Sequence, residues 1–139
     1  MKLFITFLLC VLLFACGQNS PESVGKSIEE PLIQLNNNSP WEANEATTIG
    51  VHKMKQAVQQ FEITDNSDDF LSLKSQLEVN FAEIIKNCTM KGEAHDRLHD
   101  YLMPLKDYMQ QLESDDEEKR LKTIQQLKIH LEAYDKFFI

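Results

Sequence analysis

The side chains between Cys88 and Met103 are of the kinds that bind soft metal ions. His95 and His99 are four residues apart, and on a helix that spacing puts two imidazoles on one face, within reach of one ion. Thiolate and thioether sulfurs beside imidazole favour copper(I) over Mg²⁺ or Ca²⁺, and zinc accepts the same cysteine and histidine ligands. The sequence therefore predicts a copper or zinc site with Cys88, His95 and His99 as principal ligands, assisted by Met90 and Met103.

Other interpretations of these side chains stay open. A buried cysteine usually packs as a small hydrophobe, methionines fill cores, and the histidines could be ordinary residues on the flank of a helix. Haem b could instead bind inside a helical bundle between Met54 and His130, but that leaves Cys88 unexplained, and the chain has no Cys-x-x-Cys-His motif. Cys88 with His95 or His99 could act as nucleophile and base, yet nothing in the sequence supplies an oxyanion hole. We therefore expect a protein that is not an enzyme.

The amino terminus has the pattern of a bacterial lipoprotein signal. Lys2 precedes an apolar run over 3–15 that is too short for a transmembrane helix and suits the core of a secretory signal. The run ends in Leu13-Phe14-Ala15-Cys16, which resembles a lipobox, and cleavage there would leave Cys16 to be acylated and held in a membrane. An ordinary cleaved signal with an incidental cysteine is the alternative. Residues 1–15 are predicted to be the signal peptide and Cys16 the lipidation site.

Export decides where the chain is expected to act. No aspartate follows Cys16, so the inner-membrane retention signal of enterobacterial sorting is missing, and we expect a lipid anchor in the outer membrane, facing the periplasm or the cell surface. Cys10 leaves with the signal and Cys16 carries lipid, so Cys88 is the one free thiol of the mature chain in an oxidising compartment. A formal net charge of −8 argues against nucleic acid as a partner.

The remaining chain divides into a tether and one helical domain. Residues 16–40 are rich in Asn, Ser, Glu and Pro, which predicts a disordered tether. From 41 to 139 four amphipathic patterns follow with short connections, which predicts an all-α, up-down-up-down four-helix bundle. The first pattern spans about 44–61. Ser67 is the expected N-cap of the second, Lys91-Gly92-Glu93 the corner before the third, and Ser114 the start of a capping box before the fourth.

Apolar residues spaced by three and four predict the inner face of each helix. His52 falls on the opposite side of the first helix, and His130 falls on the edge of the inner stripe of the fourth. In this topology the start of the first and third helices and the end of the second and fourth share one end of the bundle, where all the histidines gather. The predicted core positions are Val51, Met54, Val58 and Phe61; Phe70, Leu73, Leu77, Phe81, Ile84 and Cys88; Leu98, Leu102, Leu105, Met109 and Leu112; and Leu121, Ile124, Leu127, Leu131, Tyr134 and Phe138.

Two motifs support an exported helical protein. Trp-x-Ala-Asn-x-x-Thr-x-x-Gly starts at Trp41, and Cys-Thr-Met-x-Gly-x-Ala-His-x-x-Leu-His starts at Cys88, with Pro104 following. From Trp41 to about Leu112 the chain thereby resembles a family of small envelope lipoproteins of Bacteroidota-type bacteria. Members of that family often carry a histidine beside the proline, where this chain has Met103. The family has no established activity, so the resemblance implies an exported helical lipoprotein and no particular chemistry.

The sequence as a whole predicts a lipid-anchored, metal-binding envelope protein. Its membrane partner is reached through Cys16, and an unidentified envelope protein is a possible second partner. The principal alternative is a structural or interaction module of the cell envelope that binds no metal, with the end of the bundle docked onto such a partner.

Overall fold

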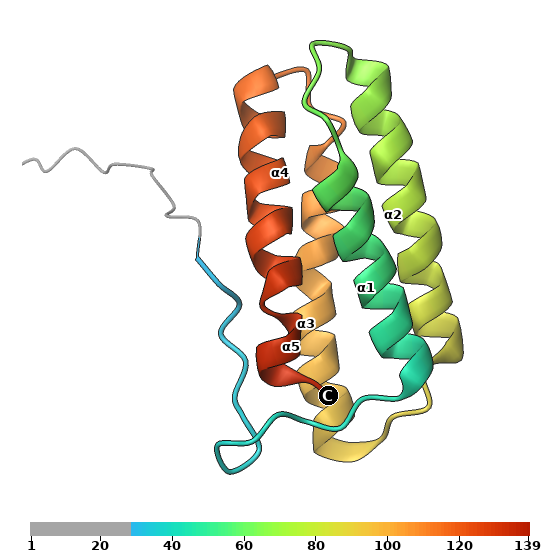
Figure 1. The fold of residues 1–139 in the computed structure, drawn as a ribbon, viewed down its shortest axis with the longest axis vertical. Coiled ribbons are helices and arrows are strands. Elements are labelled where there is room, and N and C mark those ends of the chain that lie inside the picture. Colours follow the sequence, from blue (N-terminus) through green and yellow to red (C-terminus); the bar gives the residue numbers. More distant parts are fainter. Residues whose placement is uncertain (1–28) are drawn as a thin grey trace, which may run out of the picture.

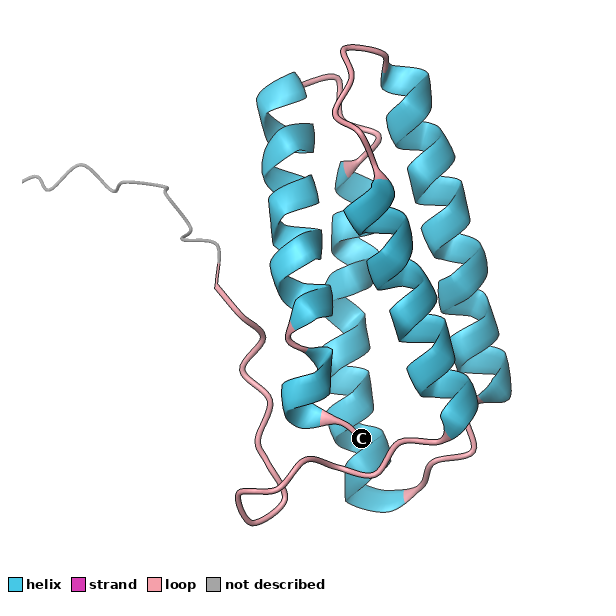
Figure 2. Ribbon diagram, in the orientation of Figure 1, coloured by secondary structure: helices cyan, strands magenta, loops and turns pink. Residues whose placement is uncertain are grey.

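Four long helices form an up-down-up-down bundle, as predicted (Figure 1). The structure is a computed structural model and describes residues 29–139. The predicted signal peptide, 1–15, and the predicted lipidation site, Cys16, lie outside the described residues. Within 29–139 only helices and loops are present, without a strand (Figure 2), and none of these helices combines the length and the apolar character that a membrane span requires. The helices are α1 (Glu45–Gln60), α2 (Ser67–Asn87), α3 (Gly92–Gln111), α4 (Glu117–Glu132) and the short α5 (Tyr134–Phe137).

The helix starts differ from the two predicted serine caps. Asn66, and not Ser67, caps α2, since its side-chain oxygen accepts a hydrogen bond from the backbone of Asp68 at 3.1 Å. Asp116, and not Ser114, caps α4 by accepting from the backbone of Lys119 at 3.3 Å. Amide and carboxylate oxygens cap helices as well as a hydroxyl does. Asn66 and Asp116 are therefore equally suitable N-caps, and their oxygens are the ones that reach the backbone of the first turn.

The predicted inner faces are buried with few exceptions. Phe61, Phe81, Cys88 and Leu121 are only partly buried and pack against the edge of the core. Tyr101 and His130 are among the buried residues that were not predicted as core positions, with exposures of 0% and 2%. The predicted stripe of the fourth helix also needs a correction. Because α4 ends at Glu132, Tyr134 reaches the core from α5, and Phe138 reaches it from the residue after α5.

The two ends of the domain meet at one end of the bundle. The backbone of Trp41 donates to the carbonyl of Phe137 at 2.8 Å and accepts from Ile139 at 2.9 Å, which forms a parallel bridge between Trp41 and Phe138. Both side chains are buried, and the ring of Phe138 stacks on Tyr134 with centroids 5.2 Å apart. The start of α1 is thereby fixed to the carboxyl terminus.

Residues 29–40, part of the predicted tether, contact the domain at several points. Asn36 and Ser39 close a tight turn through two backbone hydrogen bonds of 2.9 Å. The indole nitrogen of Trp41 donates to the carbonyl of Gln34 at 2.6 Å, and Lys136 is paired with Glu30. The approach to α1 therefore passes close to the end of the bundle that α5 closes, as the blue segment in Figure 1 shows.

α1 packs closely against α2 at Gly50. A Cβ atom at this position would lie 2.3 Å from Cγ1 of Ile84, a side chain with no exposed surface. Because Ile84 is enclosed by the core, it has little freedom to move away. Glycine is therefore required here for close helix packing and not for a special backbone conformation.

We predict that Gly50→Ala lowers the free energy of unfolding by about 1–2 kcal/mol, because overpacking outweighs the gain in helix propensity. Urea unfolding followed by circular dichroism measures the change, and Gln56→Ala on the exposed side of α1 is the control. In an Ile84→Ala background the same change should be neutral or stabilising. An equal loss in both backgrounds would contradict a Gly50–Ile84 clash.

Candidate functional site

The corner between α2 and α3 is held by Asn44, which precedes α1. Its side-chain nitrogen donates to the carbonyl of Asn87 at 3.2 Å, and its oxygen accepts from the backbone of Thr89 at 3.4 Å. Cys88 follows α2 in an extended conformation, and Gly92 opens α3 with φ +65°, a left-handed conformation that glycine adopts without steric cost. Gly92 thus starts the third helix after a sharp turn of the chain. The Asn44 contacts hold the backbone on both sides of Cys88 against the start of α1.

Three of the five predicted metal ligands line one small hollow at this corner. Cys88, His95 and His99 surround a space of about 110 Å³ together with Ile85, Leu98 and Leu102. The two imidazole rings are 4.5 Å apart between centroids and meet edge to face. Cys88 and His95 are half-buried, whereas His99 is exposed. His95 and His99 therefore lie on one face of α3, as their spacing in the sequence predicted.

The two methionines lie elsewhere. Met90 is partly buried against the core, and Met103 is 53% exposed on a different groove between α3 and α4. Within residues 29–139, no three His, Cys, Asp or Glu side chains are grouped closely enough to hold a metal ion. The metal site therefore stays a prediction, and of its three predicted sulfur side chains only that of Cys88 lines the hollow with the histidines.

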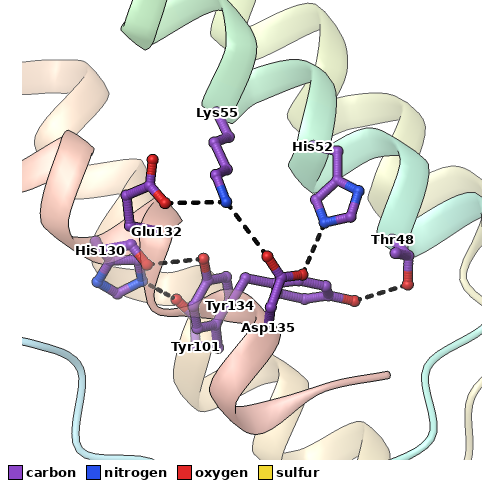
Figure 3. A network of polar contacts seen from close by, with 8 residues as sticks. All are labelled: Thr48, His52, Lys55, Tyr101, His130, Glu132, Tyr134 and Asp135. Atoms are coloured by element: carbon purple, nitrogen blue, oxygen red, sulfur yellow. Dashed lines mark hydrogen bonds and ion pairs between the residues drawn. The ribbon is translucent and has the colours of Figure 1, made fainter.

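A second polar cluster joins α1 to the end of α4 and to α5 (Figure 3). His52 contacts the carboxylate of Asp135 at 2.8 Å, and Lys55 lies 3.3 Å from Asp135 and 3.0 Å from Glu132. The hydrogen bond to Glu132 raises the pKa of Lys55, and the same bond lowers the pKa of Glu132. Burial raises the pKa of Asp135, but its bonds to His52 and Lys55 outweigh burial and lower it.

The sequence placed His52 on the side of the first helix that faces away from the core, which gave no sign of this cluster. His52 is about half exposed, yet it is paired across the helix interface. The spacing of Thr48, His52 and Lys55 on one flank of α1 was the available signal, and Thr48 also bonds the hydroxyl of Tyr134 at 3.0 Å. Exposed ion pairs contribute little stability, so the cluster adds only weak contacts between α1 and the segment where α4 ends and α5 begins.

The buried polar pair His130 and Tyr101 joins α3 to α4 through reciprocal bonds. His130 Nε2 lies 2.8 Å from the backbone carbonyl of Tyr101, which can only accept, so Nε2 carries the proton. The Tyr101 hydroxyl donates in return to the carbonyl of His130 at 3.0 Å. Burial lowers the pKa of His130 to about 4 and raises that of Tyr101 well above its ordinary value. The neutral imidazole is therefore the form that fits the folded protein.

The haem hypothesis requires His130 to bind iron. Met54 and His130 both lie in the core, so His130 is not on its edge as the sequence suggested. Its Nε2 is already bonded to Tyr101, and ligation through that atom would break the bond. Haem binding therefore stays a prediction, and it would require His130 to give up its hydrogen bond to the Tyr101 carbonyl.

Comparison with models of known protein families, with curated proteins and with solved structures finds no match. The resemblance to the envelope lipoproteins, which depends on the motifs at Trp41 and Cys88, therefore stays a prediction.

We predict that the protein loses about 3 kcal/mol of stability as the pH falls from about 6.5 to about 4, through His130 alone. Over this interval the unfolded chain binds a proton on this imidazole and the folded chain does not, so unfolding becomes more favourable as the pH falls. Urea unfolding at a series of pH values measures the loss.

The variant His130→Gln keeps a donor for the Tyr101 carbonyl but cannot titrate. It should have a smaller pH slope than the parent chain. Equal slopes for the parent and His130→Gln would contradict a neutral buried imidazole.

Proposed function

We propose that this chain is a non-enzymatic, lipid-anchored protein of the bacterial cell envelope that binds a soft or borderline metal ion, copper or zinc, through Cys88, His95 and His99. The observation that carries the metal site is the shared hollow, which is lined by the Cys88 thiol, directly after α2, and by two imidazoles of α3. Soft sulfur and imidazole donors favour copper(I) and zinc over hard cations.

Metal binding at this hollow requires a modest rearrangement of side chains. His99 is exposed and can rotate into the space, whereas His95 and Cys88 are held by half-burial and by the corner that Asn44 fixes. Copper(I) accepts few ligands, so it needs less rearrangement than a four-ligand zinc site would. Met90 and Met103 lie outside the residues that line the hollow and would assist only after a larger movement.

The metal content of the full chain tests the site. We predict that purified protein takes up copper(I) or Zn²⁺, and that Cys88→Ser and His99→Ala each weaken metal binding at least about tenfold. Loss of a residue that only supports a metal ligand already lowers metal affinity by about tenfold or more, so loss of a ligand itself should lower it at least as much. Elemental analysis and competition with a chromophoric chelator measure it. His52→Ala removes a histidine outside the hollow and is the matched control.

Failure of the parent chain to bind either metal, or an equal loss of affinity in His52→Ala, would exclude this site. An interaction module is the alternative, and it draws support from Ile85, an apolar side chain on the same hollow that is 49% exposed. In that case the Cys88 and His99 variants leave metal content unchanged and lower the capture of an envelope partner. A Soret band after expression with haem would instead support haem binding.

Lipid anchoring has its own test at Cys16. We predict that the chain expressed in a bacterium with lipoprotein processing enters the membrane fraction, and that Cys16→Ser releases it, because several acyl chains anchor a protein far more firmly than one. Mass spectrometry of the mature amino terminus identifies the acyl groups, and Cys10→Ser is the matched control. An unacylated amino terminus in the parent chain would refute the anchor.

A further inference from the structure

A groove of about 700 Å³ lies between α3 and α4 and shares no lining residue with the hollow at Cys88. Its volume is within the range of about 300–1,000 Å³ that small-molecule sites occupy. Charged residues of both signs line it, together with the Tyr108 phenol and the exposed thioether of Met103. The proposed metal site uses none of these side chains except Met103, which it places only in an assisting role.

The two signs of charge are separated onto opposite walls of the groove. Asp100 and Asp107 belong to α3, and Lys119 and Lys122 belong to α4. Arg97 already neutralises Asp100 at 2.8 Å. In the described part of the chain, the side chains of Asp107, Lys119 and Lys122 take part in no ion pair or hydrogen bond, with one another or with other residues. Three charges thus face a common space without protein partners.

This separation favours a ligand that carries both signs. An anion would meet the repulsion of Asp107, and a cation would meet that of the two lysines, whereas a dipolar ligand satisfies both walls. Two acids and two lysines line the groove, and with Asp100 paired to Arg97 the charges left for a ligand are one negative and two positive. Burial, and then the charge of Asp107, raise the pKa of Tyr108, so the phenol stays a neutral hydrogen-bonding group between the walls.

The spacing of the walls sets the length of that ligand. Axes of neighbouring helices lie about 8–10 Å apart, and an extended residue spans about 3.3–3.6 Å, so a peptide of about three residues reaches across. A free amino acid also carries both charges, but one residue spans less than half of the distance between the helix axes.

We infer that the groove between α3 and α4 binds a short peptide with free termini, its ammonium group toward Asp107 and its carboxylate toward Lys119 and Lys122. Apolar Met103 and the Pro104 ring offer contact surface for the peptide between its ends. This inference is independent of the metal site.

Trialanine with free termini is the probe, added to the ¹⁵N-labelled full chain in detergent micelles. We expect saturable NMR shifts of backbone amides along α3 and α4 at millimolar peptide, the affinity typical of a few exposed contacts. Asp107→Asn and Lys122→Gln should each weaken binding about threefold to fivefold, as expected for the loss of a partly solvated charge contact. Asp96→Asn and Lys128→Gln remove the same charges from the same helices outside the groove and are the matched controls.

Blocked peptides separate this ligand from a merely apolar one. N-acetyl-trialanine should lose its dependence on Asp107, and trialanine amide its dependence on Lys122, each with weaker binding than the free peptide. Equal affinity for the doubly blocked peptide, equal effects of the control variants, or the absence of saturable shifts in the groove would each overturn the proposal.

Discussion

The backbone bridge between Trp41 and Phe138 joins the two ends of the domain, and the arrangement at that end of the bundle depends on it. Two hydrogen bonds of 2.8 and 2.9 Å tie Trp41 to the last three residues, and the buried ring of Phe138 stacks on Tyr134. Tyr134 in turn bonds Thr48 on α1. Since α1, the α2 corner and α5 all meet here, the same bridge places Asn44, and through Asn44 the backbone on both sides of Cys88.

Inside the bundle, polar groups specify how the helices align. A buried donor or acceptor that loses its partner costs about 1–3 kcal/mol, so His130 and Tyr101 favour the one register in which both of their bonds form. At the opposite end, buried Arg120 donates to the carbonyl of Ser114 at 2.7 Å and lies over the ring of Phe70 at 4.9 Å. Apolar stripes alone permit several alignments of α3 and α4, and these bonds select one.

The two candidate sites both use α3, one near the start of the helix and the other further along it. His95 and His99 face the corner with Cys88, whereas Met103 and Asp107 face α4. The hollow is small and bears soft donors, which suits an ion, and the groove is larger and bears charges of both signs, which suits a dipolar molecule. One helix thereby presents two chemically distinct surfaces.

The sequence by itself determined the fold class, the four helices and most of the core, because the spacing of apolar residues reports directly which face of a helix is buried. It also predicted that His95 and His99 share a face, since that follows from local helix geometry. Only the tertiary structure decided that Cys88 joins them, that Met103 does not, and that His52 pairs with Asp135. Those outcomes depend on how the α2 corner turns and how α5 folds back on α1, which involve residues far apart in the chain. The burial of His130 has the same origin: its position on the helix edge left both sides possible, and the carbonyl of Tyr101 on the neighbouring helix made the buried side favourable.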